Sequence, residues 1–200
     1  MADRGTEYDE RFAELARAGR YLHGEADLVD RLLGGPPALV VDAGCGTGRV
    51  AVELHRRGYG TLGVDVDPEM LGAARAKAPQ LRWELADLAT ADLAGTEADL
   101  VLAAGNVLLF VAPASRPGAV ATMAAATRPG GLVVAGFSLA GPRPLGAALT
   151  EGTADRVLSL DAYDALCAGV GLVLVDRMAT WDGAPYAGGD YAVSVHRRIG

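Results

Sequence analysis

The chain has 200 residues, of which 50% are hydrophobic and 22% are charged, and its formal net charge is −7 at pH 7. That length and balance are typical of one compact globular domain and argue against a disordered chain. The acidic excess argues against nucleic acid as a partner, because neutralising phosphates requires clustered Lys and Arg. No apolar run approaches the roughly 18 residues that a membrane span needs, so we expect no membrane association.

The N-terminus and the cysteine content bear on the compartment and on metal binding. The first ten residues carry acids where an export signal would have a basic region and an apolar core, which predicts a cytoplasmic location. Cys45 and Cys167 are the only cysteines. They are too few for a disulfide framework or a zinc site, so we predict free thiols and no metal centre.

The first quarter of the chain predicts two helices, then a strand, a glycine turn and a third helix. Apolar residues fall at helical spacing over residues 8–18 and 24–33, and a Gly-Gly-Pro-Pro run ends the second helix. Residues 38–43 are a continuous apolar run of strand length. The glycine turn follows at 44–48, and helical spacing resumes over 49–57.

Short apolar runs and helical patterns then alternate, which is typical of βαβ units whose strands are parallel. We predict strands at 61–65, 81–85, 99–103 and 132–137, helices at 68–78 and 116–126, and a turn at 128–131.

The C-terminal part has a different pattern. Residues 138–160 predict a loop, with a short helical piece near 145–149, and 161–168 predict a last helix. Two strands follow at 172–181 and 191–198, joined by a Gly/Pro-rich connection that has no room for a crossover helix. We therefore predict that this last pair is antiparallel.

The glycine turn is the first feature that predicts chemistry. It contains Gly44, Gly46 and Gly48, between a strand that holds Asp42 and the start of a helix. Backbone N–H groups and the positive helix terminus would face a crevice there, which suits an adenosine-type ligand, although a plain tight turn has the same pattern. The sixth position of a dinucleotide G-x-G-x-x-G fingerprint is Arg49, which weighs against NAD.

Two carboxylates follow the next strands. Asp65 ends the second strand, where a carboxylate can accept hydrogen bonds from both ribose hydroxyls, or where it could cap the next helix. Asp87 follows the third strand and would lie at the same edge of the sheet. It could recognise an adenine amino group beside the amide of Leu88, or it could be a solvated loop acid.

Together these residues resemble the class I S-adenosylmethionine (SAM)-dependent methyltransferases. The resemblance is carried by VVDAGCGTG at 40–48, GVDVDPEML at 63–71, the acid Asp87 and RPGG at 128–131. It covers about 38–137, and the final antiparallel pair is similar to the reversed seventh strand of that family. It implies an α/β, Rossmann-like three-layer sandwich around a mostly parallel seven-stranded sheet with an antiparallel last strand.

The resemblance also implies a domain plan. It predicts a single small, bacterial-type methyltransferase domain over 1–200. Cap helices would occupy 1–35, the SAM-binding core 38–137, and the last helix and strand pair 161–200.

The family's cofactor contacts can be carried over residue by residue, with SAM as the cofactor. The methionyl part would lie against the strand end and the turn, at Asp42, Gly44, Cys45, Gly46 and Gly48. The ribose hydroxyls would bind Asp65. Adenine would pack on Val66 and Met70, and the polar edge of its ring would bind Asp87 and Leu88. The methionine and sulfonium would lie over Gly105 and Asn106. Val66 and Met70 could instead be core residues, and we expect no chemical use of the Cys45 sulfur.

Methyl transfer is an in-line displacement, which positioning and exclusion of water can promote without a catalytic dyad. A general base would help only if the acceptor loses a proton. The candidates for that role are His23, Glu25 and Tyr21, between the two N-terminal helices, although a capping or exposed role also explains them. His55 and His196 are expected at the surface or in packing.

The acceptor is expected to be a small molecule, because the chain shows no sizeable insertion between the last strands and no basic arm. Tyr8, Phe110, Trp181 and Tyr186 could line a pocket, although packing explains each of them as well. Two alternatives stay open: a non-catalytic SAM-binding protein of the same fold, and an NAD(P)-dependent oxidoreductase.

Overall fold

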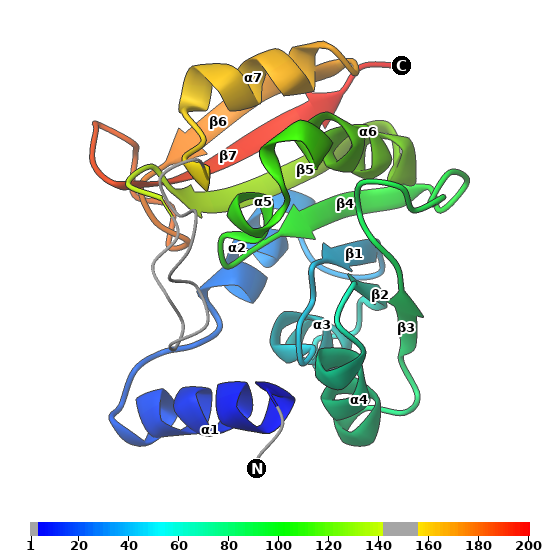
Figure 1. Cartoon of the computed structure of the whole chain (residues 1–200), viewed down its shortest axis with the longest axis vertical. Helices are drawn as coiled ribbons and strands as arrows, with labels where there is room; N and C mark the ends of the chain where they lie inside the picture. The colour runs from blue at the N-terminus through cyan, green and yellow to red at the C-terminus, as the bar shows by residue number, and fades with distance from the viewer. Residues whose placement is uncertain (1–3, 142–155) are drawn as a thin grey trace.

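The structure is a computed structural model that describes residues 4–141 and 156–200 of the chain. Its helices and strands, labelled in Figure 1 except for the short η1, follow one another in this order: α1 (Arg4–Arg17), α2 (Gly24–Leu33), β1 (Leu39–Ala43), α3 (Arg49–Arg56), β2 (Gly60–Asp65), α4 (Pro68–Lys77), β3 (Arg82–Leu85), β4 (Ala98–Ala103), α5 (Val107–Phe110), η1 (Pro113–Ser115), α6 (Arg116–Ala126), β5 (Thr127–Ser138), α7 (Leu160–Ala168), β6 (Leu172–Met178) and β7 (Tyr191–Arg198).

The described strands form a seven-stranded sheet in the order β3-β2-β1-β4-β5-β7-β6. β1 pairs in parallel with β2 and β4, β2 with β3, and β4 with β5. β7 is antiparallel to both of its neighbours, β5 and β6. The predicted fold class is therefore confirmed, and so is the antiparallel pairing of the last two strands. Because β7 is reversed, its first residue, Tyr191, lies opposite Ser138, at the edge where the parallel strands end.

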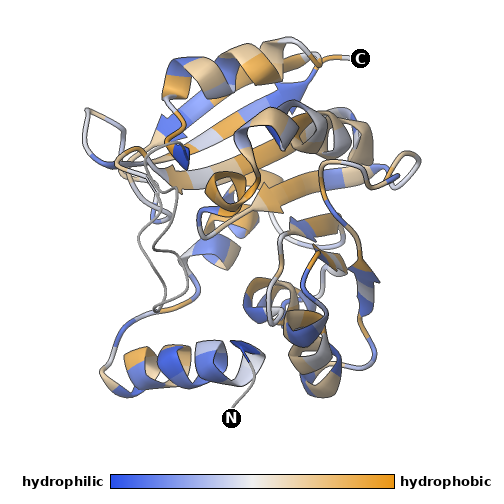
Figure 2. Ribbon diagram, in the orientation of Figure 1, coloured by the Kyte–Doolittle hydropathy of each residue, from blue (hydrophilic) through white to orange (hydrophobic). Residues whose placement is uncertain are grey.

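Helices cover both faces of this sheet, which makes the three layers. On one face α5, α6 and α7 pack against the strands through fully buried side chains such as Leu109, Met123 and Tyr163. On the other face α2 and α3 pack through Leu28 and Leu54. The central strands are apolar on both sides because each face is covered, and Figure 2 shows this apolar colour on β4 and β5.

Local signals explain where the helices beside the site begin. Gly48 precedes α3 with φ +79°, in the left-handed region that glycine tolerates. Asp67 caps α4, where its side chain accepts hydrogen bonds from the N–H groups of Glu69 at 2.9 Å and Met70 at 3.5 Å. Pro68 occupies the first turn, where its missing N–H costs nothing.

The predicted turn at 128–131 is wrong, because these residues belong to the 12-residue strand β5. Thr127 pairs with Ala98, and the register then shifts between Ala98 and Leu100. Gly130, with φ +77°, accommodates this irregularity inside the strand. The pairing with β4 therefore begins before the glycines rather than after them.

Smaller differences concern element ends. The first helix begins at residue 4 rather than 8, and β6 ends at Met178 rather than 181. The short helices α5 and η1 were not predicted, because four and three residues are too few to show a helical period. The helical piece predicted near 145–149 lies outside the described residues.

Candidate functional site

The glycine turn lies where β1 ends, and its backbone has the geometry that the sequence predicts. Gly44, Gly46 and Gly48 have φ values of +77°, +55° and +79°. The N–H groups of Gly44 and Cys45 donate to the carbonyl of Val64 at 2.8 and 3.0 Å. These bonds tie the turn to β2, so the turn and the end of β2 form one rigid edge.

The three glycines differ in what surrounds them. A Cβ on Gly44 would lie 2.5 Å from Val107, and one on Gly48 would overlap the ring of Trp83. Beside Gly46 the space within 4 Å is open among the described residues. Packing therefore excludes a side chain at the first and last positions, and the backbone angle alone disfavours one at Gly46.

Asp65 lies at the end of β2 and faces the turn. Its Oδ2 accepts from the N–H of Gly46 at 2.7 Å, and its Oδ1 accepts from the N–H of Asp67 at 2.9 Å. The capping alternative for Asp65 is wrong, since Asp67 caps α4. A carboxylate that accepts two backbone bonds still has two lone-pair positions, which suffices for a pair of ribose hydroxyls.

The residues expected around adenine lie at the same edge. β3 pairs with β2 up to Leu85, opposite Asp65, and Asp87 follows two residues later. Asp87 is exposed and its Oδ1 accepts from the N–H of Ala89 at 2.8 Å, whereas the Leu88 side chain is buried.

Val66 and Met70 lie on the next segment of the same rim. Val66 is 64% exposed and Met70 is half-buried. The core alternative is therefore wrong for Val66, which presents an apolar surface to solvent beside Asp65.

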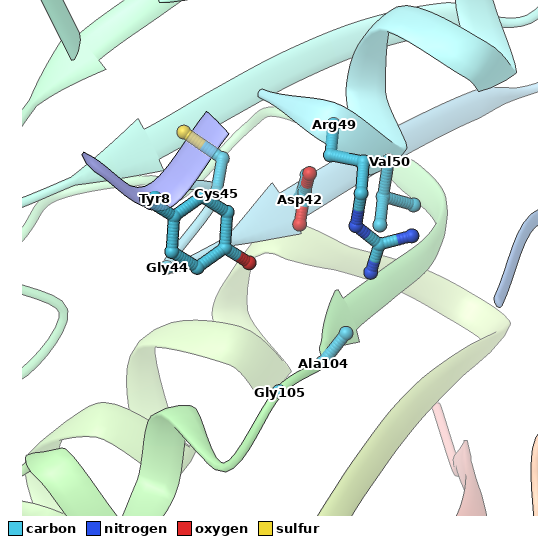
Figure 3. A pocket seen from close by; sticks show the side chains of 8 residues that line it. All are labelled: Tyr8, Asp42, Gly44, Cys45, Arg49, Val50, Ala104 and Gly105. Carbon is cyan, nitrogen blue, oxygen red and sulfur yellow. The ribbon is translucent and has the colours of Figure 1, made fainter. Parts of the chain in front are cut away.

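A cavity beside the turn is lined by two side chains of opposite charge, Asp42 and Arg49 (Figure 3). It measures about 30 Å³, which is room for about two water molecules. Its walls come from α1, β1, the glycine turn, α3 and the segment after β4: Tyr8, Asp42, Gly44, Cys45, Arg49, Val50, Ala104 and Gly105. The Tyr8 ring, from α1, is one of the side chains that line this space.

Burial changes the ionisation of the acids and the thiol in this cavity. Asp42 is 3% exposed, and its Oδ2 accepts from the N–H of Ala51 at 3.1 Å. Burial raises the pKa of Asp42 to about 7, although the Ala51 bond and the charge of Arg49 oppose the shift. Burial likewise raises the pKa of Cys45 far above its ordinary value. That thiol is therefore a poor nucleophile, in line with the expectation that its sulfur is not used.

Arg49, the first residue of α3, connects this cavity to both N-terminal helices. Its Nη2 lies 2.5 Å from Glu25 Oε1 and its Nη1 lies 3.2 Å from Glu25 Oε2. Nη1 also donates to the carbonyl of Leu22. The guanidinium carbon lies 4.8 Å from the ring centre of Phe12, on α1.

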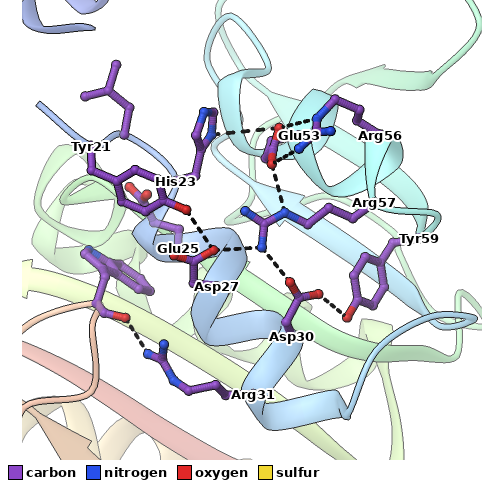
Figure 4. Close-up of polar contacts among 12 residues, drawn as sticks. Tyr21, His23, Glu25, Asp27, Asp30, Arg31, Glu53, Arg56, Arg57 and Tyr59 are labelled. Carbon is purple, nitrogen blue, oxygen red and sulfur yellow. Dashed lines mark hydrogen bonds and ion pairs between the residues drawn. The ribbon is translucent and has the colours of Figure 1, made fainter. Parts of the chain in front are cut away.

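The structure does not bring the candidate base residues His23 and Tyr21 into the cavity (Figure 4). Tyr21 is 69% exposed and donates to Asp27 at 3.0 Å. The Nδ1 of His23 lies 3.9 Å from a carboxylate oxygen of Glu53, a buried residue of α3. Glu25 reaches the site through its ion pair with Arg49.

The other two histidines lie away from the site, as expected. His55 is exposed on α3. His196 is 1% exposed and its Nε2 lies 3.2 Å from Asp164 Oδ1, under α7.

Gly105 and Asn106 differ in what they contribute. Gly105 lines the cavity. Asn106, in the left-handed region at φ +68°, uses its Oδ1 to accept from the N–H of Ser138 at 2.8 Å, while its own N–H donates to Gly136 at 3.2 Å. Its side chain therefore links the segment after β4 to the last residue of β5.

Sequence reasoning missed residues that the fold brings to this edge. From the sequence, Arg49 has a meaning only as the residue that breaks a dinucleotide fingerprint. Tyr191 lies at the edge because β7 is reversed, and its hydroxyl accepts from Trp181 Nε1 at 3.0 Å. Trp181 covers Gly136, where a Cβ would overlap the indole ring. That glycine in a strand was the available signal, because such a glycine often marks close packing by a neighbour.

Phe110 is 38% exposed and is not part of the buried core, so the packing alternative is wrong for this residue. Among the described residues no group of three or more His, Cys, Asp or Glu side chains is arranged to hold a metal ion. No helix in the described ranges is long and apolar enough to cross a membrane.

Comparisons with known proteins agree with this geometry. Residues 40–131 match a family model described as a methyltransferase domain. The crystal structure of a TehB-like SAM-dependent methyltransferase from Corynebacterium glutamicum is 32% identical, with a TM-score of 0.83 over 97% of each chain. That likeness extends over both the sequence and the fold.

Curated relatives match over shorter stretches. Methyltransferase-like protein 27 from Homo sapiens is 38% identical over 133 residues, which cover 64% of this chain and 51% of that protein. Magnesium-protoporphyrin O-methyltransferase from Rhodobacter capsulatus is 35% identical over 79 residues, which cover 37% of this chain and 34% of that protein. The chain thus spans about half or less of the length of these curated relatives. By its fold, its glycine turn and these likenesses, the chain belongs to the class I SAM-dependent methyltransferases.

Proposed function

We propose that this chain transfers the methyl group of SAM to a small-molecule acceptor by in-line displacement. The observation that carries the proposal is the convergence of Asp42, the glycine turn and Asp65 on one edge of the sheet, linked by the bond from Gly46 N–H to Asp65. Along this edge, Asp42 and the turn suit the methionyl part of the cofactor, and Asp65 suits its ribose.

Each part of SAM has a proposed partner at this edge of the sheet. We assign the methionyl part to the cavity of Asp42 and Gly44, with Gly105 beneath the sulfonium. The ribose hydroxyls are assigned to the free lone pairs of Asp65. Adenine is assigned to the exposed apolar surface of Val66, beside which Met70, Asp87 and Leu88 complete its site.

The chain's own contribution to the reaction is positioning and exclusion of water. When bound, SAM supplies an electrophilic methyl group on its sulfonium. Tyr8, Val50 and Ala104 line the cavity and would position the donor and displace water from it when SAM binds. Asp42 is committed to the Ala51 N–H. The proposed mechanism therefore assigns no general base, and none of His23, Glu25 and Tyr21 has that role in it.

The acceptor side is proposed at the edge formed by β4, β5 and the reversed β7. Trp181 and Tyr191 form a hydrogen-bonded aromatic pair there, which suits a small ring-containing or apolar acceptor. The net charge of −7 disfavours nucleic acid. Both cysteines are free and buried, which agrees with the proposed cytoplasmic location.

Calorimetric titration tests the cofactor assignment. Purified protein is titrated with SAM and S-adenosylhomocysteine (SAH), with NAD and NADP as controls at fixed salt. Binding of the first two alone, with Kd on the order of micromolar, would support the proposal. Binding of the nicotinamide nucleotides instead would favour an oxidoreductase, and binding of none would overturn the cofactor assignment.

A second measurement tests the transfer itself. Formation of SAH from SAM is followed with a panel of small hydroxyl, amine and thiol compounds, and in parallel with RNA and a protein extract. SAH formed only with a small compound supports the proposal. Methylation of RNA or protein alone would contradict the small acceptor, and tight SAM binding without any turnover would favour the non-catalytic alternative.

A further inference from the structure

The two edge strands of the sheet differ in how well they are protected against pairing with another chain. β3, at one edge, has four residues and carries the exposed Arg82. A short, charged edge strand discourages such pairing. β6, at the other edge, has seven residues, and no strand in the described part of the chain pairs with its outer side (Figure 1).

Exposed apolar side chains gather at the β6 edge. Val173, Leu174 and Val175 are each at least 40% exposed. Ile199 is 57% exposed, and a bond from its N–H to the carbonyl of Gly171 at 2.9 Å holds it beside the start of the strand. These four residues, the β6 patch, make up four of the ten large hydrophobic side chains that are exposed in 4–141 and 156–200. Single exposed apolar residues are ordinary, whereas a contiguous group of them marks an interaction surface.

The surface beside the patch is hollowed. A cavity of about 270 Å³ lies there, and its walls are mostly apolar, with Leu172, Leu174 and Ile199 among them. The carboxylate in its wall, Asp164, pairs with Arg177 at 2.5 Å. The hollow therefore offers apolar surface together with a carboxylate that already has a cation.

The backbone of β6 leaves a regular outer edge for pairing. Residues 172–174 keep an unbroken register with β7, and the register shifts only after Leu174, before Asp176. β6 contains no Lys and no Pro, which are the residues that commonly protect an edge strand. The start of this strand can therefore accept another strand beside it.

The charges at the two ends of β6 favour a second copy of this chain as that partner. Asp176 is exposed towards the end of the strand, and Arg197 is exposed opposite Val173, at its start. Neither has an ion-pair partner among the described residues; Asp176 accepts from the N–H of Arg177, and Arg197 donates to the carbonyl of Gly130. Two edge strands related by a two-fold axis run antiparallel, so the end of one lies beside the start of the other. Opposite charges would then meet at both ends.

We propose that the β6 patch is the interface of a homodimer, in which the β6 strands of two copies pair antiparallel. Burial of the patch supplies the affinity, and the two contacts between Asp176 and Arg197 select the antiparallel direction. β4, β5 and β7 lie between β6 and β1. The interface is therefore remote from the glycine turn, and the proposal does not depend on the proposed function.

Sedimentation velocity of the full chain tests the proposal. Wild-type protein between about 1 and 100 µM should be a dimer, or should change from monomer to dimer within that range. Val173→Lys places a charge inside the interface and should weaken dimerisation about 100-fold. Leu85→Lys is the matched control, because it changes an apolar residue that is 52% exposed on the other edge strand, β3. It should dimerise as wild type does.

Charge reversal tests the antiparallel arrangement. Asp176→Arg and Arg197→Asp should each weaken dimerisation at least about tenfold, because like charges then face each other twice in every dimer. A mixture of the two variants should form a heterodimer about as tightly as wild type dimerises, since every facing pair again has opposite signs.

Each outcome decides the proposal. A wild-type chain that stays monomeric at every concentration would overturn it, and so would a dimer that Leu85→Lys disrupts and Val173→Lys does not. Charge reversals without effect, or losses that the mixture does not restore, would overturn the antiparallel pairing. If a circular dichroism melt shows that Val173→Lys is unfolded, the mixture decides instead, because both of its substitutions are at exposed positions.

Discussion

Both N-terminal helices come before the first strand in the sequence, but different kinds of interaction attach them to the rest of the molecule. α2 buries Ala26, Leu28 and Val29, each at most 2% exposed, against the sheet. In α1, Gly5 is the one residue that is buried among the described positions 4–17. α2 is thus part of the hydrophobic core, whereas α1 lies beside the cavity at the glycine turn, to which it contributes Tyr8.

Charge reinforces the attachment of α2 to α3 (Figure 4). The side chain of Arg57, 16% exposed, lies 2.8 Å from Asp27, 2.5 Å from Asp30 and 2.8 Å from Glu53. The hydroxyl of Tyr59 also donates to Asp30 at 2.7 Å. Arg57 and Glu53 are largely shielded from water, whereas Asp27 and Asp30 are about a third exposed. Removal of Arg57 would therefore take the shared cation from three carboxylates.

The polar contacts of α1 lie at the rim. Asp9 pairs with Lys77 at 2.8 Å and accepts from the hydroxyl of Thr47 at 2.6 Å. Arg4, with a side chain 65% exposed, pairs with Asp67 at 2.9 Å. Exposed ion pairs contribute little to stability. The comparison indicates that α2 is fixed to the sheet by its core contacts, whereas α1, which contributes Tyr8 to the cavity, has most of its polar contacts at the rim.

The largest expected effect comes from breaking the α2 cluster. Arg57→Met should lower the free energy of unfolding by about 3 kcal/mol, because three carboxylates lose a shared partner. Urea denaturation followed by circular dichroism measures this. Arg56→Met, which removes an exposed guanidinium from the same helix, should cost much less. Equal losses in the two variants would contradict a cooperative cluster centred on Arg57.

Substitution of a candidate site residue that neither helix holds should change ligand affinity without changing how the helices are attached. Asp65 is bonded to Gly46 and Asp67, so Asp65→Ala should weaken SAM binding by about 2 kcal/mol, or about 30-fold. Calorimetry with SAM and SAH measures it, with the exposed acid variant Asp92→Ala as the control. Affinity like that of wild type in Asp65→Ala would refute the ribose assignment.

Low pH should weaken the attachment of α2 to α3, because the ion-pair cluster of Arg57 includes the carboxylate of Glu53. Arg56 and then Arg57 hold the pKa of this carboxyl at about 2, below its ordinary 4.5. Since the pKa in the folded state is lowered, the stabilisation is present above pH 4.5 and is lost as the pH falls from about 4.5 towards 2.

Glu53→Gln should accordingly lower the free energy of unfolding by between about 1 and 2 kcal/mol at pH 7. The difference from wild type should disappear near pH 2. Urea denaturation at a series of pH values tests this, and a difference independent of pH would contradict it.

The smallest effect on stability is expected at α1. Lys77→Met removes an exposed partner of Asp9 and should change the free energy of unfolding by less than about 0.5 kcal/mol. Hydrogen exchange should nevertheless become faster in 4–17, and added salt should have the same effect on wild type. Unchanged protection of α1 in both experiments would show that it is not held by its rim ion pairs.

Much of the site could be predicted from the sequence, because its signals are local. The glycines of the turn need particular backbone angles, which the residue type itself determines. Asp65 could be placed because parallel strands end at a common edge, so position at a strand end already defines a neighbourhood. The antiparallel last pair followed from a connection too short for a crossover helix.

Other features were decided only by tertiary structure, since they depend on residues far apart in the chain. The sequence alone does not show that Arg49 meets Glu25, 24 positions away, because many pairings of these charges are compatible with the same helices. The RPGG segment predicts a turn by itself, yet it lies in a strand because Thr127 pairs with Ala98. The sequence by itself thus determined the backbone of the candidate site, and long-range packing decided which side chains cover it and which charges face it.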